Sequence, residues 1–224
     1  KKYWLMKINT IGVVGSGQMG GGIAQVCAQS GYQVVLSEVS QALLEKGLSA
    51  IAASLERSIK KGTIKSHDRD AILDRISGTT AIESLHRCDL VIEAVTEDLD
   101  LKRRIFARLD KICLPHAILA SNTSSLSVRE MAAATSRPDR VLGLHFFNPV
   151  PLMALVELIK TDLTADSTVE AGKKLAETLG KTVVVVQDSP GFIVNRLMVP
   201  QILTAIRLLE SGVAGKEDID TAMT

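Results

Sequence analysis

Short apolar runs alternate with longer amphipathic stretches along most of the chain. Runs rich in β-branched residues indicate buried strands, and apolar residues spaced three or four apart indicate helices. The pattern predicts strands at residues 7–14, 33–36, 76–81, 90–94, 117–120, 140–144, 153–159 and 182–186, the last of these fully buried. It predicts helices at 18–29, 40–61, 98–113 and 165–179, another beginning near 128, and a polar connection through residue 70. This alternation is typical of a doubly wound α/β domain with a mostly parallel sheet.

The first predicted strand leads directly into a glycine-rich turn, Gly-Ser-Gly-Gln-Met-Gly, at residues 15–20. Gly15 permits a tight turn, Gly17 lets a pyrophosphate approach the backbone at the helix N-terminus, and Gly20 lets that helix pack close to the strands. Glu38 ends the next strand, at about the spacing where an acidic residue binds the ribose hydroxyls and repels a 2′-phosphate. A glycine-rich turn without a ligand is the alternative, but the flanking strands and the acid favour a Rossmann-type domain that binds NAD.

The chain changes character near its end. Asp-Ser-Pro-Gly at 188–191 interrupts the strand pattern, and the apolar spacing is helical from Phe192 onward. A change of this kind is typical of a domain boundary. We therefore predict an NAD-binding Rossmann-type domain at 1–187 and the beginning of an all-helical substrate and dimerisation domain at 188–224.

Composition narrows the function classes. The chain has 26 Lys and Arg residues against 25 Asp and Glu residues, which gives a formal net charge of +1. No excess of charge therefore favours binding to nucleic acid or to an anionic membrane. No apolar run approaches the roughly 20 residues of a transmembrane helix. The 3 cysteines form no CxxC pair and no His pair has metal-ligand spacing, so we expect neither disulfides nor a metal. We expect a cytoplasmic protein, or a mitochondrial-matrix one if an N-terminal segment has been removed, and Met6 is a candidate start.

Residues 143–161 carry the most suggestive chemistry. A lone His145 follows an apolar run, two prolines then force a turn, and Glu157 is the carboxylate within the next apolar strand. If the two strands pair around the turn, His145 and Glu157 face each other as an acid/base dyad in which the carboxylate orients the imidazole. The alternative is a buried structural histidine bonded to a backbone carbonyl.

Five small polar residues, Ser-Asn-Thr-Ser-Ser at 121–125, follow another buried strand. Ligands bind at the carboxyl ends of strands in open parallel sheets, so this loop is a candidate site. Helix capping is the alternative. Ser127 alone would cap the helix that begins near 128, which leaves the other hydroxyls for a ligand.

Read together, five blocks of sequence resemble the L-3-hydroxyacyl-CoA dehydrogenases, a family that includes the 3-hydroxybutyryl-CoA dehydrogenases of bacteria. The blocks are SNTSSL (121–126), GLHFFNPVP (143–151), LVELIKT (155–161), DSPGFIVNRL (188–197) and KEDIDTAM (216–223). The resemblance covers essentially the whole chain. It implies an NAD-dependent oxidoreductase of fatty acid β-oxidation that transfers hydride to or from C3 of a coenzyme A thioester.

The resemblance also implies roles for individual residues. It makes His145 the catalytic base and Glu157 the carboxylate that orients it, with Ser124 and Asn195 beside the substrate oxygen and the nicotinamide. The implied NAD contacts are Gly15, Gly17, Met19, Gly20, Glu38, Glu97, Lys102, Ser124 and Asn148. The implied contacts to the acyl-CoA substrate are Ser54 and Lys61, two turns apart on one helix face, together with Ser124 and Asn195.

The chain departs from the family pattern at two places. Family members usually have Asp at the position of Glu38, although the longer side chain can still bind ribose. They also continue for several dozen residues past the KEDIDTAM block. The chain is therefore expected to be truncated and to lack helices that complete a homodimer interface and close over the substrate.

Three other functions compete with this interpretation. A hydrolase built from Ser124, His145 and Glu157 would lack the GxSxG elbow and would leave the glycine motif without a purpose. A non-catalytic NAD-binding protein of the same fold would not need the implied catalytic residues. A dehydrogenase of a hydroxy acid or sugar acid without coenzyme A is the third, and Ser54 and Lys61 favour the thioester over it.

Overall fold

The chain forms one eight-stranded sheet with helices around it. The computed structural model describes residues 7–223, so the candidate start Met6 lies outside the described residues. The strand order is β3-β2-β1-β4-β5-β6-β7-β8. The strands are Thr10–Val14 (β1), Gln33–Ser37 (β2), Ile76–Thr79 (β3), Leu90–Glu93 (β4), Ile118–Ser121 (β5), Val141–Phe146 (β6), Leu155–Lys160 (β7) and Thr182–Gln187 (β8). The helices are Gln18–Gln29 (α1), Gln41–Lys60 (α2), Asp68–Leu73 (α3), Leu99–Ile112 (α4), Val128–Ala132 (α5), Asp166–Thr178 (α6), Val194–Glu210 (α7) and Lys216–Met223 (α8), with 3-10 turns at Ile82–Arg87 (η1) and Pro138–Arg140 (η2).

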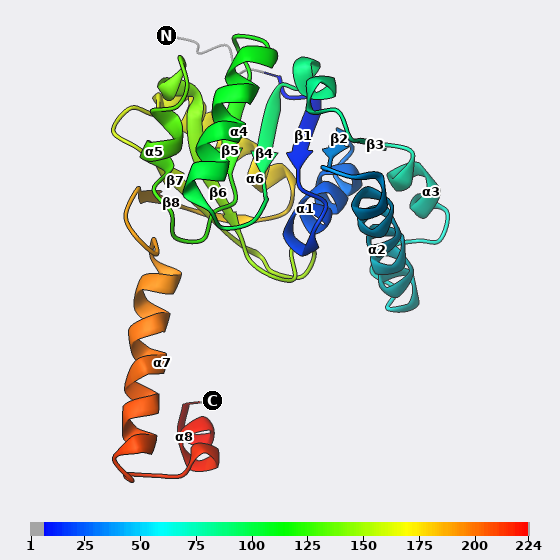
Figure 1. Cartoon of the computed structure of the whole chain (residues 1–224). Helices are drawn as coiled ribbons and strands as arrows, with labels where there is room; N and C mark the ends of the chain where they lie inside the picture. Colours follow the sequence, from blue (N-terminus) through cyan, green and yellow to red (C-terminus); the bar gives the residue numbers. More distant parts are fainter. Residues whose placement is uncertain (1–6, 224) are drawn as a thin grey trace.

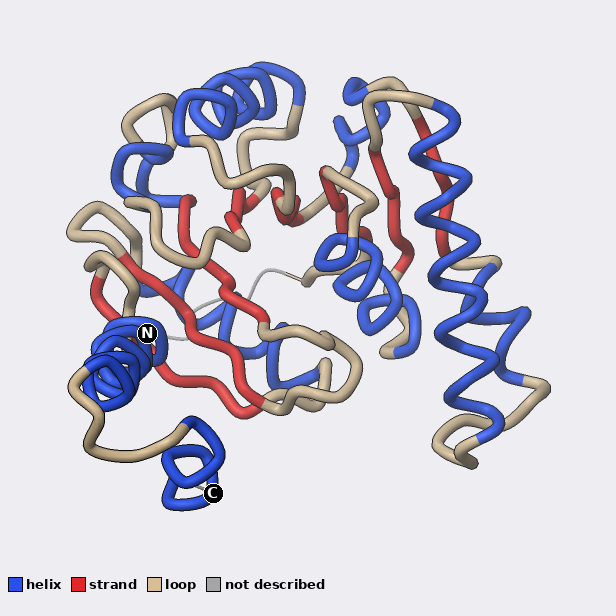
Figure 2. The backbone as a smooth tube through the Cα atoms, turned by 60° about the horizontal axis from the view of Figure 1, so that its bottom comes forward, coloured by secondary structure: helices blue, strands red, loops and turns tan. Residues whose placement is uncertain are grey.

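Helices cover both faces of the sheet (Figures 1 and 2). On one face α1, α2 and α6 contribute Ile23, Leu55 and Leu175 to a buried apolar cluster. On the other face α4 and α5 contribute Phe106 and Met131 to a second cluster. Strands β1 to β6 are parallel, β7 runs antiparallel to β6, and β8 is parallel to β7. The predicted doubly wound, mostly parallel sheet is confirmed.

Two local predictions were wrong. The polar connection through residue 70 contains a short helix, α3, in which only Ile72 is buried, so its sequence carries almost no apolar period.

Strand β8 is not fully buried, and Val185 is 42% exposed. Because β8 is the edge of the sheet, it pairs with a neighbour on one side only. A run of valines looks the same in an edge strand as in a central one.

Helices α7 and α8 stand away from the sheet (Figure 1). Neither helix contains a buried residue, although α7 carries an apolar stripe. The exposed apolar side chains of the two helices and their connection are Leu197, Met198, Val199, Ile202, Leu203, Ile206, Leu208, Leu209, Val213 and Met223. A contiguous apolar surface of this kind marks a site of association.

The turn from β1 into α1 depends on two glycines. Gly15 has φ +97°, a conformation that side chains other than that of glycine rarely allow. A Cβ atom on Gly20 would lie 1.9 Å from the carbonyl oxygen of Gly15. Gly17, by contrast, has φ −64° and no heavy atom within 4 Å of its Cβ position. The close approach of helix to turn therefore rests on Gly20, and Gly17 leaves open space at the helix N-terminus.

We expect Gly20→Ala to lower the free energy of unfolding by about 2 kcal/mol or more, because the methyl group would overlap a backbone atom that cannot rotate away. The matched variant Gly17→Ala should change it by less than about 1 kcal/mol. Urea denaturation of the two variants checks this. Equal stabilities for both variants would contradict the close packing.

Candidate active site

The antiparallel pairing of β6 with β7 brings His145 opposite Glu157. The imidazole Nδ1 lies 2.7 Å from Glu157 Oε2, and the two side chains are 7% and 0% exposed. The predicted meeting of the two residues across the turn is confirmed. Because an ionised carboxylate only accepts hydrogen bonds, Nδ1 carries the proton and Nε2 is left as the acceptor. Within the described part of the chain Nε2 has no hydrogen-bond partner.

The second oxygen of Glu157 binds the beginning of α7. Oε1 accepts hydrogen bonds from the backbone N–H groups of Ile193, at 2.9 Å, and Val194, at 3.0 Å. The chain reaches this position through Phe192, which has φ +51° and is buried. The Phe192 ring centroid lies 5.7 Å from that of His145, and the Phe147 ring centroid lies 4.4 Å from it. This link could not be predicted from the sequence, because backbone N–H groups are common to almost every residue.

Ser124 and Asn195 are brought together as the resemblance implied. The amide nitrogen Nδ2 of Asn195 donates to the carbonyl oxygen of Ser124 at 3.1 Å. Ser124 in turn donates to Glu97 Oε1 from its backbone N–H, at 2.9 Å, and from its hydroxyl, at 3.2 Å. Glu97, Ser124 and Asn195 thus link three separate parts of the chain.

A cavity of about 290 Å³ opens at this point. It is lined by Met19, Ala94, Val95, Glu97, Asn122, Ser124, His145, Phe146, Phe147 and Asn148. Five of the predicted site residues are among these side chains. Asn122 was not predicted, and its Oδ1 accepts a hydrogen bond from the backbone N–H of Phe146 at 2.9 Å. It therefore fixes the strand end that carries His145.

The loop at 121–125 supplies fewer free hydroxyls than we expected. Ser121 and Thr123 are fully buried, and their hydroxyls bond to Glu93, at 2.7 Å, and to Glu97, at 2.5 Å. Ser127 caps α5, as predicted, so the hydroxyls at 121–125 are not needed for the cap. Ser124 is the hydroxyl residue of the loop that lines the cavity.

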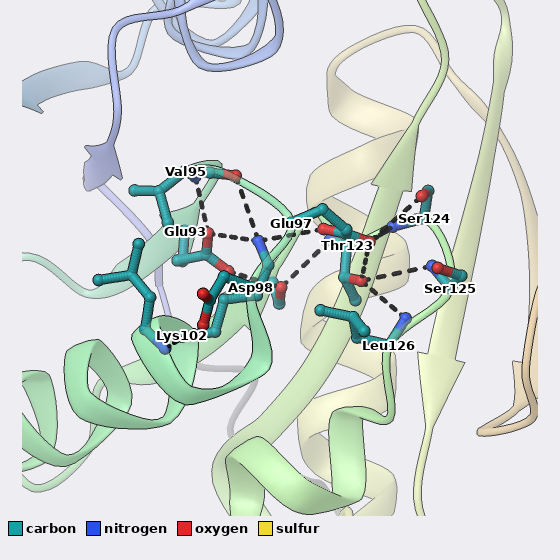
Figure 3. A network of polar contacts seen from close by, with 11 residues as sticks. Glu93, Val95, Glu97, Asp98, Lys102, Thr123, Ser124, Ser125 and Leu126 are labelled. Carbon is teal, nitrogen blue, oxygen red and sulfur yellow. Dashed lines mark hydrogen bonds and ion pairs between the residues drawn. The ribbon is translucent and has the colours of Figure 1, made fainter.

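Beneath this loop lies a network of charged groups (Figure 3). Lys102 is 1% exposed, and its Nζ lies 2.7 Å from Glu93 Oε1 and 3.4 Å from Glu97 Oε2. Burial raises the pKa of Glu97, but hydrogen bonds from Thr123 and Ser124 outweigh it and hold that pKa below its ordinary value. Lys102 was predicted to contact NAD; the structure places its ammonium group in this ion-pair network, and the contact itself stays a prediction. Glu93 was not predicted to belong to the site.

A second cavity, of about 770 Å³, lies beside the glycine turn and is lined by Gly15, Gly17, Glu38 and residues 94–96. Glu38 Oε2 accepts hydrogen bonds from the backbone N–H of Ser16 at 2.8 Å and from its hydroxyl at 3.0 Å. Burial raises the pKa of Glu38, but these two bonds and a third from the backbone N–H of Val39 outweigh the effect of burial. The net shift of the pKa is therefore downward. The open space at Gly17 and the carboxylate beyond it fit a dinucleotide.

A third cavity, of about 580 Å³, lies between α1, α2 and the turn at 148–151. Ser54 lines it together with Lys46 and Arg57. Lys61 caps the C-terminus of α2 and is exposed, but it does not line the cavity. Of the two implied coenzyme A contacts, Ser54 therefore lines this cavity and Lys61 does not.

The three cysteines are buried and remote from this chemistry. Burial raises the pKa of Cys27 and of Cys88 to about 12 and that of Cys113 to about 11. Residues 7–223 contain no group of His, Cys, Asp and Glu side chains that could hold a metal ion. None of the helices described is long and apolar enough to cross a membrane.

Comparisons with known proteins place these features in context. The family model "3-hydroxyacyl-CoA dehydrogenase, NAD binding domain" matches residues 10–189, and "3-hydroxyacyl-CoA dehydrogenase, C-terminal domain" matches residues 191–224. The chain is 48% identical over 218 residues to 3-hydroxybutyryl-CoA dehydrogenase of Mycobacterium tuberculosis, covering 96% of this chain and 76% of the relative. It is 49% identical over 222 residues to the mitochondrial hydroxyacyl-coenzyme A dehydrogenase of Rattus norvegicus, covering 96% and 71%. The crystal structure of (S)-3-hydroxybutyryl-CoA dehydrogenase from Ralstonia eutropha superposes with a TM-score of 0.92 at 48% identity, covering 95% of this chain and 75% of that one.

Proposed function

The chain belongs to the family of NAD-dependent 3-hydroxyacyl-CoA dehydrogenases, and we propose that it transfers hydride between NAD(H) and C3 of a 3-hydroxyacyl-CoA or 3-ketoacyl-CoA. The observation that carries this proposal is the His145–Glu157 pair, 2.7 Å apart, whose imidazole lines the same cavity as Ser124 and Asn148. A dinucleotide bound along the glycine turn would present its nicotinamide to that cavity, since Ala94 and Val95 line both cavities.

NAD, when bound, supplies the hydride acceptor of the oxidation. His145 Nε2 accepts the proton of the 3-hydroxyl group, and in reduction the imidazolium returns a proton to the 3-keto oxygen. Glu157 holds the ring with Nδ1–H toward itself, which keeps Nε2 available, and its charge stabilises the imidazolium. We assign the Ser124 hydroxyl and the Asn195 amide to the same oxygen, as the resemblance implies; to bind it, the hydroxyl would exchange its bond to Glu97 and the amide its bond to the Ser124 carbonyl oxygen.

The cavity between α1 and α2 supports a coenzyme A substrate. Lys46 and Arg57 line it beside Ser54, so cationic groups stand where a phosphate-bearing chain would pass. Its other wall is the turn at 148–151, which begins at the cavity of the dyad. Lys61 would act only on a part of the substrate that extends past the end of α2. A substrate without coenzyme A remains the alternative, and it would leave this cavity empty.

The C-terminal helices support a homodimer. Their exposed apolar side chains form one surface that nothing in residues 7–223 covers, and a second copy of the chain is the occupant that we propose. We propose an NAD-binding domain at residues 1–187 and, at 188–224, the beginning of a helical domain that adds substrate contacts such as Asn195 and forms the dimer interface. We also propose the cytoplasm as the compartment; the relative from Rattus norvegicus is a mitochondrial protein.

The substrate proposal predicts NADH consumption with acetoacetyl-CoA and with longer 3-ketoacyl-CoAs, and at least ~10-fold slower consumption with free acetoacetate at the same concentration. The loss corresponds to about 1.4 kcal/mol of transition-state binding from the coenzyme A part. Absorbance at the NADH band measures both rates. Equal rates would remove coenzyme A from the proposal.

The variant His145→Gln serves as the control for the chemical step. It should lower turnover at least ~10²-fold, since acid/base catalysis is lost, while the Kd for NAD stays near that of the unchanged protein. Near-normal turnover in this variant would refute the role of His145.

The dimer proposal predicts twice the monomer mass in light scattering after size exclusion. Replacing Ile202 and Ile206 by Asp, at 50% and 45% exposure on α7, should yield a monomer because charges cannot be buried unpaired at an apolar interface. Leu114→Asp, at 42% exposure after α4, is the matched control and should stay dimeric. A monomer in the unchanged protein would end the proposal.

A further inference from the structure

We propose that Lys181 is a positioning residue for the acyl-CoA substrate, because its ammonium group fixes the turn at 148–153 that borders the path of the thioester. This inference rests on the proposed function, since it concerns the substrate of that reaction. Lys181 lies between α6 and β8, directly before the first residue of β8. Its side chain is buried and lines none of the three cavities described above, so we assign it no direct contact with the substrate.

The ammonium group is bound by main-chain carbonyl groups of the turn. Lys181 Nζ donates to the carbonyl oxygen of Val150 at 2.6 Å and to that of Met153 at 2.8 Å. Within the turn, the carbonyl oxygen of Pro149 accepts the backbone N–H groups of Leu152 and Met153, at 2.9 Å and 3.0 Å. The lysine therefore adds two bonds from outside, and a single nitrogen atom ties together two peptide groups three residues apart.

The main chain on both sides of Lys181 is itself held in place. Gly180 has φ +73° and ends α6, and the backbone N–H of Lys181 donates back to the carbonyl oxygen of Ala176 at 3.0 Å, which is the usual glycine stop of a helix. One residue later the N–H of Thr182 donates to the carbonyl oxygen of Ala154 at 2.7 Å. The side chain thus reaches the turn from a fixed base.

The turn borders both cavities that an acyl-CoA would occupy. Residues 148–151 line the cavity beside α2, and Asn148 also lines the cavity of His145. Val150 is buried, and a Cβ atom on Gly22 would lie 2.9 Å from its Cβ, so the turn packs closely against α1. A thioester arm that runs from the cationic cavity to His145 would follow this turn. The position of the turn therefore affects how well the arm fits.

The charge of Lys181 is costly where it stands. Within residues 7–223 its ammonium group bonds to the two carbonyl oxygens and forms no ion pair with a carboxylate, and burial lowers the pKa of Lys181. An apolar side chain would avoid that cost. What an apolar side chain cannot do is donate to two carbonyl oxygens, whereas an ammonium group carries three donors on one atom. Holding the turn is the property that requires a lysine here.

The variant Lys181→Met tests the inference, because it removes the donors and keeps most of the volume. The two carbonyl groups must then find water as a donor, which displaces the turn. We expect the KM for acetoacetyl-CoA to rise at least ~5-fold, with kcat and the calorimetric Kd for NAD each within about threefold of the unchanged protein. A lysine that only stabilised the fold would lower the thermal midpoint without this change in KM. An unchanged KM in the folded variant would overturn the inference.

Acetoacetyl-pantetheine, which lacks the phosphate groups of coenzyme A, separates positioning from direct contact. A lysine that bound a phosphate group would affect only acetoacetyl-CoA, whereas a displaced turn affects both thioesters. We therefore expect Lys181→Met to lower kcat/KM by about the same factor for both. A loss confined to acetoacetyl-CoA would show direct contact and would contradict the positioning role.

Two further variants keep the test decisive. Thr168→Val removes another buried donor to a main-chain carbonyl group, that of Asp139 at 2.8 Å, and should lower the thermal midpoint while KM stays the same. Lys181→Gln keeps a neutral donor on a side chain one bond shorter, so it should fold even if Lys181→Met does not. It should raise KM at least ~twofold, since we expect it to reach only one of the two oxygens, and an unchanged KM would count against the inference. Failure of the unchanged protein to reduce acetoacetyl-CoA would instead refute the proposed function itself.

Discussion

One buried carboxylate, that of Glu157, fixes the relation between the chemistry and the fold. A carboxylate with no exposed surface is stable only when donors surround it. Three donors do so here from two directions, the imidazole of His145 on β6 and the backbone N–H groups of Ile193 and Val194 at the start of α7. The N-terminus of a helix also stabilises negative charge. The same group therefore orients the catalytic histidine and anchors the helix that leaves the sheet.

A second buried carboxylate, Glu93, organises the neighbouring strand end in a comparable way. Glu157 has backbone N–H groups and an imidazole as partners, whereas Glu93 has a lysine, a serine and one backbone N–H. Between the two lies the cavity lined by Ser124 and His145. Asn122 ties its walls together by accepting the backbone N–H of Phe146. Rigid groups on both sides of the cavity allow a cofactor and a substrate to meet in one geometry.

The sequence predicted the parts of this arrangement that depend on spacing. The glycine turn, the acid Glu38 and the pairing of His145 with Glu157 follow from short connections that permit few geometries. The role of Glu93 could not be predicted, because an acidic residue at the end of an apolar strand usually faces water. Contacts by backbone N–H groups at Ile193 and Val194 leave no mark on the sequence. The covered position of Lys102 depends on how α4 packs, which residue spacing does not fix.

The central claim is that Glu157 selects the tautomer of His145. The variant Glu157→Gln tests it directly, because a glutamine Oε1 can still accept the two backbone N–H groups of α7 while its amide nitrogen donates toward Nδ1. The imidazole would then carry its proton on Nε2 and could not accept one from the substrate hydroxyl. The measurement is kcat for oxidation of a 3-hydroxyacyl-CoA at saturating NAD, with the thermal midpoint recorded alongside. We predict a fall of about 10³- to 10⁴-fold, as wrong-tautomer variants of other His–carboxylate pairs show, with an intact fold. A kcat within about threefold of the unchanged protein would contradict the account.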